Sequence, residues 1–343
     1  MKAIDRLFKL YTKLDKYCKD FDEELVKDKK IMHSKVTPRI AQNLRKEYET
    51  IRKLLKNNKI DHTIARIKSA GVLLKEVEFL SKGKITYPEA IKFYKSIYLD
   101  YFYNHYFCEK SYFKHYNIKK NPSMFENMIP VNLSIKQIIE IIDDIYTDFC
   151  KKYKIPYDHD IKKMKIKYDP SYAANTVDGV ITLNPEFKKP NNWTFYILIH
   201  ELGHGFHDMM IEKLCKKKEY IYHQDIDHFS TTADGFTIWF SNIVVNRVKD
   251  KEMRKMLKKC HRQYLKYTRY RARMEYLFFT GKSKQMKDLK KYEMLRMLCF
   301  PAYKAVYYPA YLVFRKIEDI NVLRKVFALG FCPMTSVKKL LGL

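Results

Sequence analysis

The pattern of apolar and polar positions predicts one helix after another over the first 155 residues. The pair Thr37-Pro38 is typical of a helix cap followed by proline at the first helical position, and it predicts a helix that continues to about Lys56. Tyr87-Pro88 predicts the start of another helix, which we expect to continue through Tyr101 and Phe107.

A further helix is predicted to begin after Ser134. Gln137 stands three residues later, and the two residues resemble a capping box, in which each side chain bonds to the backbone N–H of the other. Isoleucines at helical spacing follow at Ile135, Ile138, Ile139, Ile142 and Ile145.

The pattern changes between about residues 161 and 185. Residues 163–168 alternate with period two, and residues 180–184 follow the turn signal Asp178-Gly179. We expect a small sheet of two or three strands here, inserted in a helical protein. Helices are predicted to resume after Pro190, one of them through His200 and another from about Asp227 to Val248.

The scarcity of turn-forming residues supports a mainly α fold. Nine glycines and eleven prolines in 343 residues favour long helices over a sandwich or barrel of many strands. No linker rich in glycine, serine or proline is present. We therefore expect one compact unit, with a helical amino-terminal part at 1–155 and a second part at 156–343 that carries the small sheet next to the helix of His200.

The formal charge of +28 raises the question of a nucleic-acid partner. The lysines are scattered along the whole chain and form no arm or stripe, so nucleic acid is possible but not favoured as a partner. Seven dispersed cysteines without a Cys-x-x-Cys pair are typical of reduced thiols. The amino terminus lacks the apolar run of a signal peptide, and the most apolar stretch, 236–245, is too short for a membrane helix. We expect a cytoplasmic protein, or one from another reducing compartment, with no membrane partner.

The main candidate for chemistry is the run His200-Glu201-Leu202-Gly203-His204. Histidines four residues apart on a helix lie about 40° apart around its axis, so both imidazoles can reach one metal ion. Glu201 lies about 100° from His200 and can direct its carboxylate at a water molecule on that ion. Catalytic zinc needs this combination of neutral imidazoles, an open position for water and a carboxylate base.

A third ligand is expected from the segment 225–234. Asp227 and Asp234 are seven residues apart and share a helix face, with Ser230 between them. Asp227 could bind the metal while Asp234 holds a histidine or a backbone group from outside the metal shell.

These residues resemble the thimet oligopeptidase and oligopeptidase F family of zinc metallopeptidases. The family has a His-Glu-x-Gly-His-x-x-His run, matched here at 200–207, and a Glu-x-x-Ser-x-x-x-Glu helix, matched at Asp227, Ser230 and Asp234 with aspartate for both glutamates. The resemblance implies that His200, His204 and Asp227 hold one Zn²⁺, that Glu201 is the general base and that His207 supports the site. The shorter aspartate keeps His228 open as an alternative ligand.

A second matching region lies near residue 300. The family's tyrosine-rich Gly-Tyr-x-Ala-x-Tyr-Tyr segment, which supplies transition-state donors, is similar to residues 302–311. Tyr303, Tyr307 and Tyr311 are spaced by four and could present three hydroxyl groups on one helix face. Met297 stands where the family has a histidine. The resemblance covers residues 181 to the end.

The resemblance implies a helical, two-lobed zincin-type fold with the active site in a cleft. We expect a zinc-dependent endopeptidase or oligopeptidase in which Glu201 takes a proton from a zinc-bound water that attacks a peptide substrate. Residues 180–184 are the candidate edge strand, with Val180, Ile181 and Thr182 contacting an extended peptide.

Two alternatives from other classes stay open. One is a catalytically inactive relative that binds a peptide or protein, which the aspartate at position 227 would favour. The other is a basic nucleic-acid-associated protein with a structural zinc. A structural site is usually closed by four protein ligands, and no cysteine stands beside the histidines to close it.

Overall fold

The structure is a computed structural model. It describes residues 2–27, 31–33, 35–56, 61–97, 122–158, 160–171, 173–177, 179–216, 232–279, 297, 307–330, 332 and 334–343. Contacts divide the chain into two units, the first comprising residues 1–113, 225–229 and 274–303, and the second 114–224, 230–273 and 304–343. The division predicted from the sequence, at residues 155 and 156, stays a prediction.

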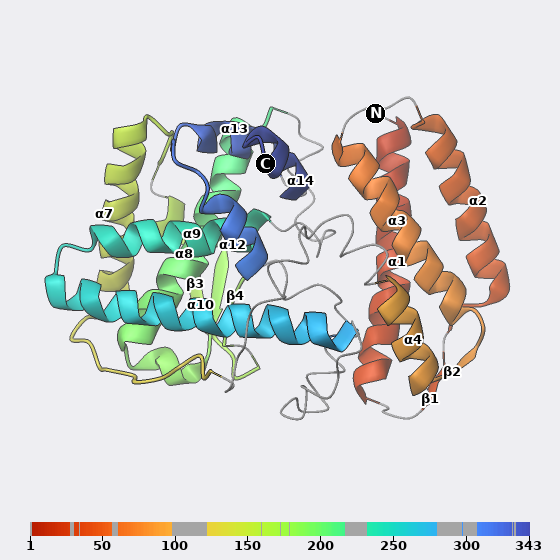
Figure 1. The fold of residues 1–343 in the computed structure, drawn as a ribbon, viewed down its shortest axis with the longest axis horizontal. Coiled ribbons are helices and arrows are strands. Elements are labelled where there is room, and N and C mark those ends of the chain that lie inside the picture. The colour runs from red at the N-terminus through yellow and green to blue at the C-terminus, as the bar shows by residue number, and fades with distance from the viewer. Residues whose placement is uncertain are drawn as a thin grey trace. The chain divides into compact units, whose positions relative to one another are not determined.

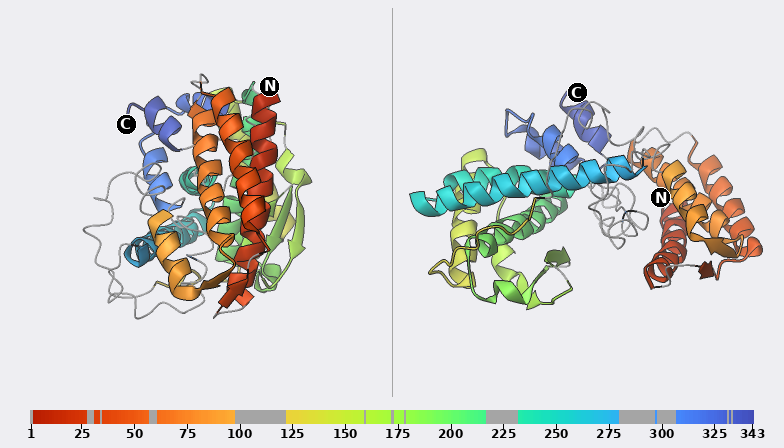
Figure 2. Two further views of the ribbon diagram at one scale, coloured as in Figure 1. Left: turned by 90° about the vertical axis from the view of Figure 1, so that its right-hand side faces the viewer. Right: turned by 60° about the horizontal axis from the view of Figure 1, so that its bottom comes forward.

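The first unit contains helices α1 (Lys2–Lys27), α2 (Pro38–Leu54), α3 (Asp61–Leu80) and α4 (Tyr87–Ile97), with the short strands β1 (Ile31–His33) and β2 (Lys84–Thr86). Helices α1, α2 and α3 lie side by side (Figures 1 and 2). Strand β1 pairs with β2 in antiparallel fashion. Leu10 and Leu14 of α1, Ile51 of α2 and Val77 of α3 are fully buried in the core of this unit.

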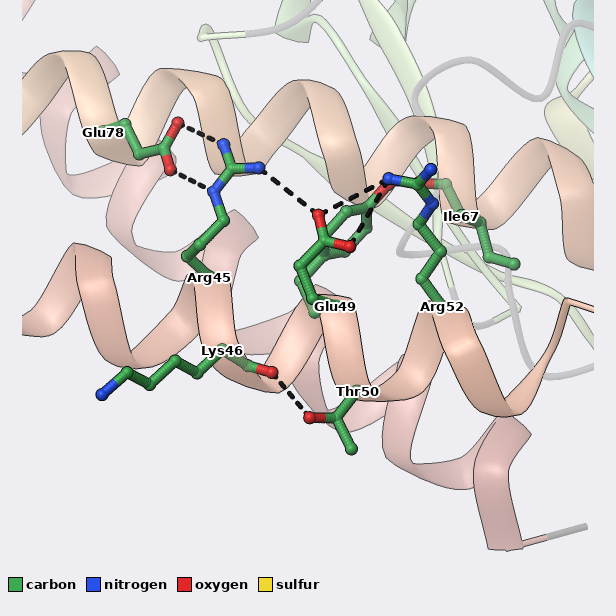
Figure 3. A network of polar contacts seen from close by, with 8 residues as sticks. Arg45, Lys46, Glu49, Thr50, Arg52, Ile67 and Glu78 are labelled. Carbon is green, nitrogen blue, oxygen red and sulfur yellow. Dashed lines mark hydrogen bonds and ion pairs between the residues drawn. The ribbon is translucent and has the colours of Figure 1, made fainter.

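An ionic network joins the outer faces of α2 and α3 (Figure 3). The Arg45 guanidinium donates two hydrogen bonds of 2.6 Å to the Glu78 carboxylate, and Glu49 lies 3.5 Å from both Arg45 and Arg52. These groups are partly exposed, and such pairs usually contribute about 1 kcal/mol or less to stability. The buried apolar faces therefore supply most of the packing energy between α2 and α3.

The second unit contains helices α7 (Ile135–Tyr153), α8 (Asn192–Leu214), α9 (Thr232–Arg247), α10 (Lys251–Phe279), α12 (Tyr308–Phe314), α13 (Val322–Ala328) and α14 (Met334–Leu340). The residues of α10 up to Arg273 belong to this unit. It also holds the strands β3 (Lys165–Tyr168), β4 (Ala174–Val177) and β5 (Val180–Leu183) and the 3₁₀ turns η2 (Asp160–Lys163) and η3 (Pro185–Lys188). The protein is thus mainly helical with a small three-stranded sheet, as the sequence pattern predicted.

Several local predictions are confirmed. Thr37 caps α2 by accepting a hydrogen bond from the Ile40 backbone, and Ser134 and Gln137 form the expected capping box of α7. The helix predicted from Tyr87 begins there, while its continuation to Tyr101 and Phe107 lies outside the described residues. Each of these signals is local, so the surrounding fold does not change it.

Helix α8 is the central element of the second unit. Residues 192–203 are all buried, because α7, α9, α13 and strand β4 pack around this helix (Figure 1). The Asn191 side chain caps its first turn by accepting hydrogen bonds from the backbone of Trp193 and Thr194. A helix that is apolar on all sides can pack in this way, and it carries the few polar residues of its middle turns into the interior.

The strand order corrects one expectation. The sheet runs β3-β5-β4, with β5 parallel to β3 and antiparallel to β4. The prediction that residues 180–184 form an edge strand was wrong, because neighbours on both sides use the backbone hydrogen-bonding groups of β5. Val180, Ile181 and Thr182 therefore cannot pair with a peptide by strand addition. Strand β4, which packs against α8, is an outer strand of this sheet.

Two glycines allow α8, α9 and α12 to approach closely. A Cβ added to Gly203 of α8 would lie 3.3 Å from the Thr237 side chain on α9. A Cβ added to Gly235 of α9 would lie 2.5 Å from the Ala310 Cβ and 2.8 Å from the Ala310 carbonyl carbon on α12. The second contact is the more severe, since it involves backbone and is shorter than real Cβ contacts.

Two further findings bear on the class of protein. In the part of the chain that the structure describes, no helix combines the length and the apolar character that crossing a membrane requires. Five cysteines in these segments are buried and form no disulfide with another described residue, namely Cys18, Cys150, Cys215, Cys260 and Cys332.

We expect Gly235→Ala to lower the free energy of unfolding by about 1–3 kcal/mol, because the added methyl group must displace the α12 backbone. This loss exceeds the gain of about 1 kcal/mol that alanine has over glycine inside a helix. Urea denaturation of the two proteins measures the difference. Gly203→Ala is the matched control, since Thr237 needs to move by only a few tenths of an ångström. An equal or larger loss in the control would contradict this packing argument.

Glu76 of α3 generates a pH prediction. Its carboxylate accepts a hydrogen bond from Tyr94, and burial raises the pKa of Glu76 above its ordinary value. The folded protein thus holds this proton more tightly than the unfolded chain, so stability falls as pH rises from about 4.3 through the folded pKa. Glu76→Gln should remove this loss, and its advantage over the wild type should grow with pH in urea denaturation. Glu78→Gln, on the partly exposed outer face, should change the free energy of unfolding by about 1 kcal/mol or less at each pH.

Candidate metal and catalytic site

Three side chains from α8 and α9 converge in the second unit. The Asp234 Oδ1 lies 3.5 Å from the His204 Nε2 and 3.9 Å from the His200 Nε2. One ligand atom from each of the three residues lies within 4.8 Å of the others. Helical spacing places the two histidines on one face of α8, and the close packing of α9 at Gly203 brings Asp234 opposite them.

The distances in this cluster suit a shared cation. They exceed the 2.7–3.2 Å that is typical of hydrogen bonds to nitrogen, so direct hydrogen bonds do not set the spacing. Ligands that surround one ion tetrahedrally at about 2.0–2.1 Å are separated from each other by about 3.3 Å. The separations of 3.5 and 3.9 Å from Asp234 are close to this value.

Burial prepares His200 as a ligand. Its side chain is 7% exposed, and burial, together with the neighbouring His204 and His261, holds the pKa of His200 well below its usual range. A neutral imidazole binds a metal ion without first losing a proton. The buried His200 Nδ1 has no hydrogen-bond partner among the described residues. The His200 Nε2 thus faces the cluster, and the Nδ1 has no hydrogen-bond acceptor among the described residues.

Glu201 is held beside the cluster by the sheet. The Thr176 hydroxyl of β4 donates a hydrogen bond of 2.6 Å to the Glu201 Oε2. Burial raises the pKa of Glu201, while His204 and the Thr176 hydrogen bond lower it. The carboxylate therefore has a fixed direction in a site where water is largely excluded, since Glu201 is only 7% exposed.

Buried polar side chains of α10 also lie close to His200 and to its helix. The Tyr264 hydroxyl lies 3.5 Å from the His200 Nε2, and the two rings are 5.3 Å apart. One turn earlier, His261 Nδ1 lies 3.0 Å from the Tyr196 hydroxyl. Burial lowers the pKa of His261 to about 4, so this imidazole is neutral at physiological pH.

The residues predicted from the sequence have different outcomes. His200 and His204 come together, and Asp234, expected outside the metal shell, has a carboxylate oxygen among the potential ligand atoms. Glu201 lies near enough to His204 and Asp234 for their charges to act on it. Asp227, expected as the third ligand, and the alternative His228 lie outside the described residues. Their assignment stays a prediction.

The supporting residues are more dispersed. His207 is buried, lies 3.2 Å from an Asp208 carboxylate oxygen, and packs against the ring of Phe236. Tyr311 is buried with its ring 6.5 Å from that of His261, and Tyr307 immediately precedes α12. Tyr303 lies outside the described residues. Transition-state roles for the three tyrosines and a supporting role for His207 stay predictions.

Three residues near the site were not found from the sequence, namely Thr176, His261 and Tyr264. The two on α10 carried a usable signal. They are three residues apart on a helix and, with Thr268, form a buried polar series at positions where an amphipathic helix normally has apolar residues. Thr176 carried no such signal, since its contact depends on the strand order.

Comparisons of the chain with protein-family models, with curated proteins and with solved structures found no match. The residues of the site therefore carry the functional argument.

We expect Asp234→Ala to weaken zinc binding by more than about 100-fold, because it removes a ligand atom rather than an outer partner, whose loss typically costs about 10–100-fold. His200→Ala and His204→Ala should have losses at least as large. A titration with zinc in a competing chelator measures all three.

Asp208→Ala is the matched control, since Asp208 is an α8 carboxylate beside His207 and outside the cluster. It should keep wild-type zinc affinity. Comparison with Asp227→Ala decides between the two aspartates. A larger loss in Asp227→Ala than in Asp234→Ala would contradict the ligand set that the geometry favours.

Proposed function

We propose that this protein is a zinc-dependent metallopeptidase that hydrolyses peptide bonds. The observation that carries the proposal is the arrangement of His200, His204 and Asp234 at the spacing of a shared ion, with the buried carboxylate of Glu201 beside them. Two imidazoles and one carboxylate form a ligand set typical of catalytic zinc, which keeps a position open for water or substrate.

The donor chemistry supports zinc over other common ions. Calcium and magnesium prefer ligand sets made only of oxygen, whereas imidazole nitrogens suit zinc and other transition metals. A zinc ion held there would supply Lewis-acid chemistry, polarising the peptide carbonyl and acidifying water.

The residues of the chain would have the following roles. Glu201 accepts a proton from the attacking water and returns it to the leaving amine. Thr176 orients this carboxylate through its 2.6 Å hydrogen bond. The burial of α8 excludes bulk water, which strengthens the electrostatic interactions within the site.

Strand β4 is the better candidate for binding an extended peptide. The Asn184 backbone N–H donates a hydrogen bond to the Ala173 carbonyl, so residues 173 and 184 form a hydrogen-bonded pair next to the β4–β5 ladder. Hydrogen-bonded pairs alternate along the ladder with pairs that make no hydrogen bond to each other. In an antiparallel ladder of this register, the backbone groups of residues 174 and 176 point away from β5. We propose that they pair with the substrate, so that Thr176 contacts the peptide through its backbone and Glu201 through its side chain.

The proposal includes membership of the thimet oligopeptidase and oligopeptidase F family and its two-lobed zincin-type fold. Support comes from the sequence run at 200–207, from its place on a buried helix and from the small sheet next to that helix. A peptide is the proposed partner, and a reducing compartment such as the cytoplasm is the proposed location.

We expect Glu201→Gln to keep the fold and the bound zinc and to lose about 10²–10⁴-fold in peptide hydrolysis, because an amide cannot accept the proton of water. Digestion of a peptide mixture, followed by mass spectrometry, measures the rate, and metal analysis measures the zinc. Glu212→Gln, an exposed change on the same helix, should match the wild type. Wild-type rates in Glu201→Gln would exclude it as the base, and a wild type that holds zinc without cleaving any peptide would overturn the proposed function.

A further inference from the structure

Tyr264 of α10 lies next to the cluster of potential metal ligands. Its hydroxyl lies 3.5 Å from the His200 Nε2, the same nitrogen that lies 3.9 Å from the Asp234 carboxylate. The tyrosine is 6% exposed. Its phenol group therefore reaches the cluster from α10, whereas the three potential ligands come from α8 and α9.

Neighbouring rings hold this phenol in place. The Tyr264 ring lies 5.6 Å from that of Tyr196 on α8 and 5.3 Å from that of His200. The Tyr196 hydroxyl in turn lies 3.0 Å from the Nδ1 of His261, which is one turn before Tyr264 on α10. Two contacts between the same pair of helices thus fix the position of Tyr264, and a group fixed in this way needs little reorganisation during a reaction.

The distance to His200 indicates what the hydroxyl can do. At 3.5 Å it is longer than a usual O–H···N hydrogen bond and close to the roughly 3.3 Å that separates neighbouring ligands of a tetrahedral zinc ion. A substrate oxygen bound to an ion on the Tyr264 side of the His200 Nε2 could therefore accept a hydrogen bond from the phenol.

We infer that Tyr264 is a further catalytic residue, whose hydroxyl donates a hydrogen bond to the carbonyl oxygen of the scissile peptide bond as negative charge develops on it. The inference rests on the proposed function. The proton stays on the phenol throughout, so the step adds stabilisation without a new bond. Of the tyrosines predicted from the sequence, Tyr311 is placed differently, since its described ring contacts are with His261 and Tyr308.

The test is Tyr264→Phe in the full chain, which keeps the ring and removes the hydroxyl. Acetohydroxamic acid is a suitable probe, because it offers anionic oxygens to zinc and makes no demand on peptide sequence. We expect the zinc affinity and the unfolding midpoint to stay unchanged. The dissociation constant for acetohydroxamic acid should rise about 10–100-fold, because the variant loses a hydrogen bond to a charged group. For peptides, kcat should fall about 10²–10³-fold with little change in KM.

Tyr267→Phe, a partly exposed tyrosine on the same helix, is the matched control and should match the wild type in every measurement. If Tyr264→Phe binds acetohydroxamic acid as tightly as the wild type does, the inference is wrong. Loss of zinc from Tyr264→Phe would also overturn it, because the hydroxyl would then belong to the metal shell. If Tyr264→Phe hydrolyses peptides at the wild-type rate while Glu201→Gln is inactive, this inference is wrong and the proposed function stands. A zinc-loaded wild type that neither binds the probe nor cleaves peptides would refute the proposed function as well.

Discussion

The close packing of α8 against α9 determines the geometry of the site. The side chain of Gly203 is a single hydrogen atom, and this lets Thr237 of α9 approach the α8 backbone. Asp234 is one turn before Thr237, so the same approach brings its carboxylate to the two histidines. Gly235 has a similar role towards α12, where Ala310 fills the space that a side chain would need. The small residue at position 203 thus sets how far a carboxylate on α9 lies from the imidazoles on α8, and the one at position 235 sets how closely α12 approaches α9.

The burial of α8 has a cost that the polar residues of the site partly offset. Histidine and glutamate are rarely buried without partners, because removing a charged or polar group from water is unfavourable. Here the Thr176 hydrogen bond satisfies one oxygen of Glu201. The Tyr264 hydroxyl and the Asp234 carboxylate lie 3.5 Å and 3.9 Å, respectively, from the His200 Nε2. A metal ion would offset more of this cost, since it would neutralise the cluster and use the nitrogen lone pairs. A site of this kind stabilises the fold only when it binds the metal ion, because the ion binds the folded protein more tightly than the unfolded chain.

The net charge of +28 and the chemistry of the site concern different parts of the molecule. The charged residues that make up the excess are spread along the chain, whereas the site consists of buried and half-buried residues from α8, α9, α10 and β4. A basic surface would attract acidic peptides by long-range electrostatics, a contribution that salt would screen.

The sequence by itself determined the local features of this protein. Capping residues at Thr37 and Ser134, the period-two alternation near residue 165 and the spacing of His200 and His204 depend on neighbours within a few residues, so they could be predicted without the fold. The tertiary structure alone decided that β5 is a central strand, that Asp234 faces the histidines, and that Thr176 and Tyr264 lie beside them. The side-chain contacts of Thr176, Asp234 and Tyr264 join residues 25 to 64 positions apart in the chain, and their geometry depends on how strands pair and how closely helices pack. No local pattern encodes those distances, because they result from the burial of whole helix faces against one another.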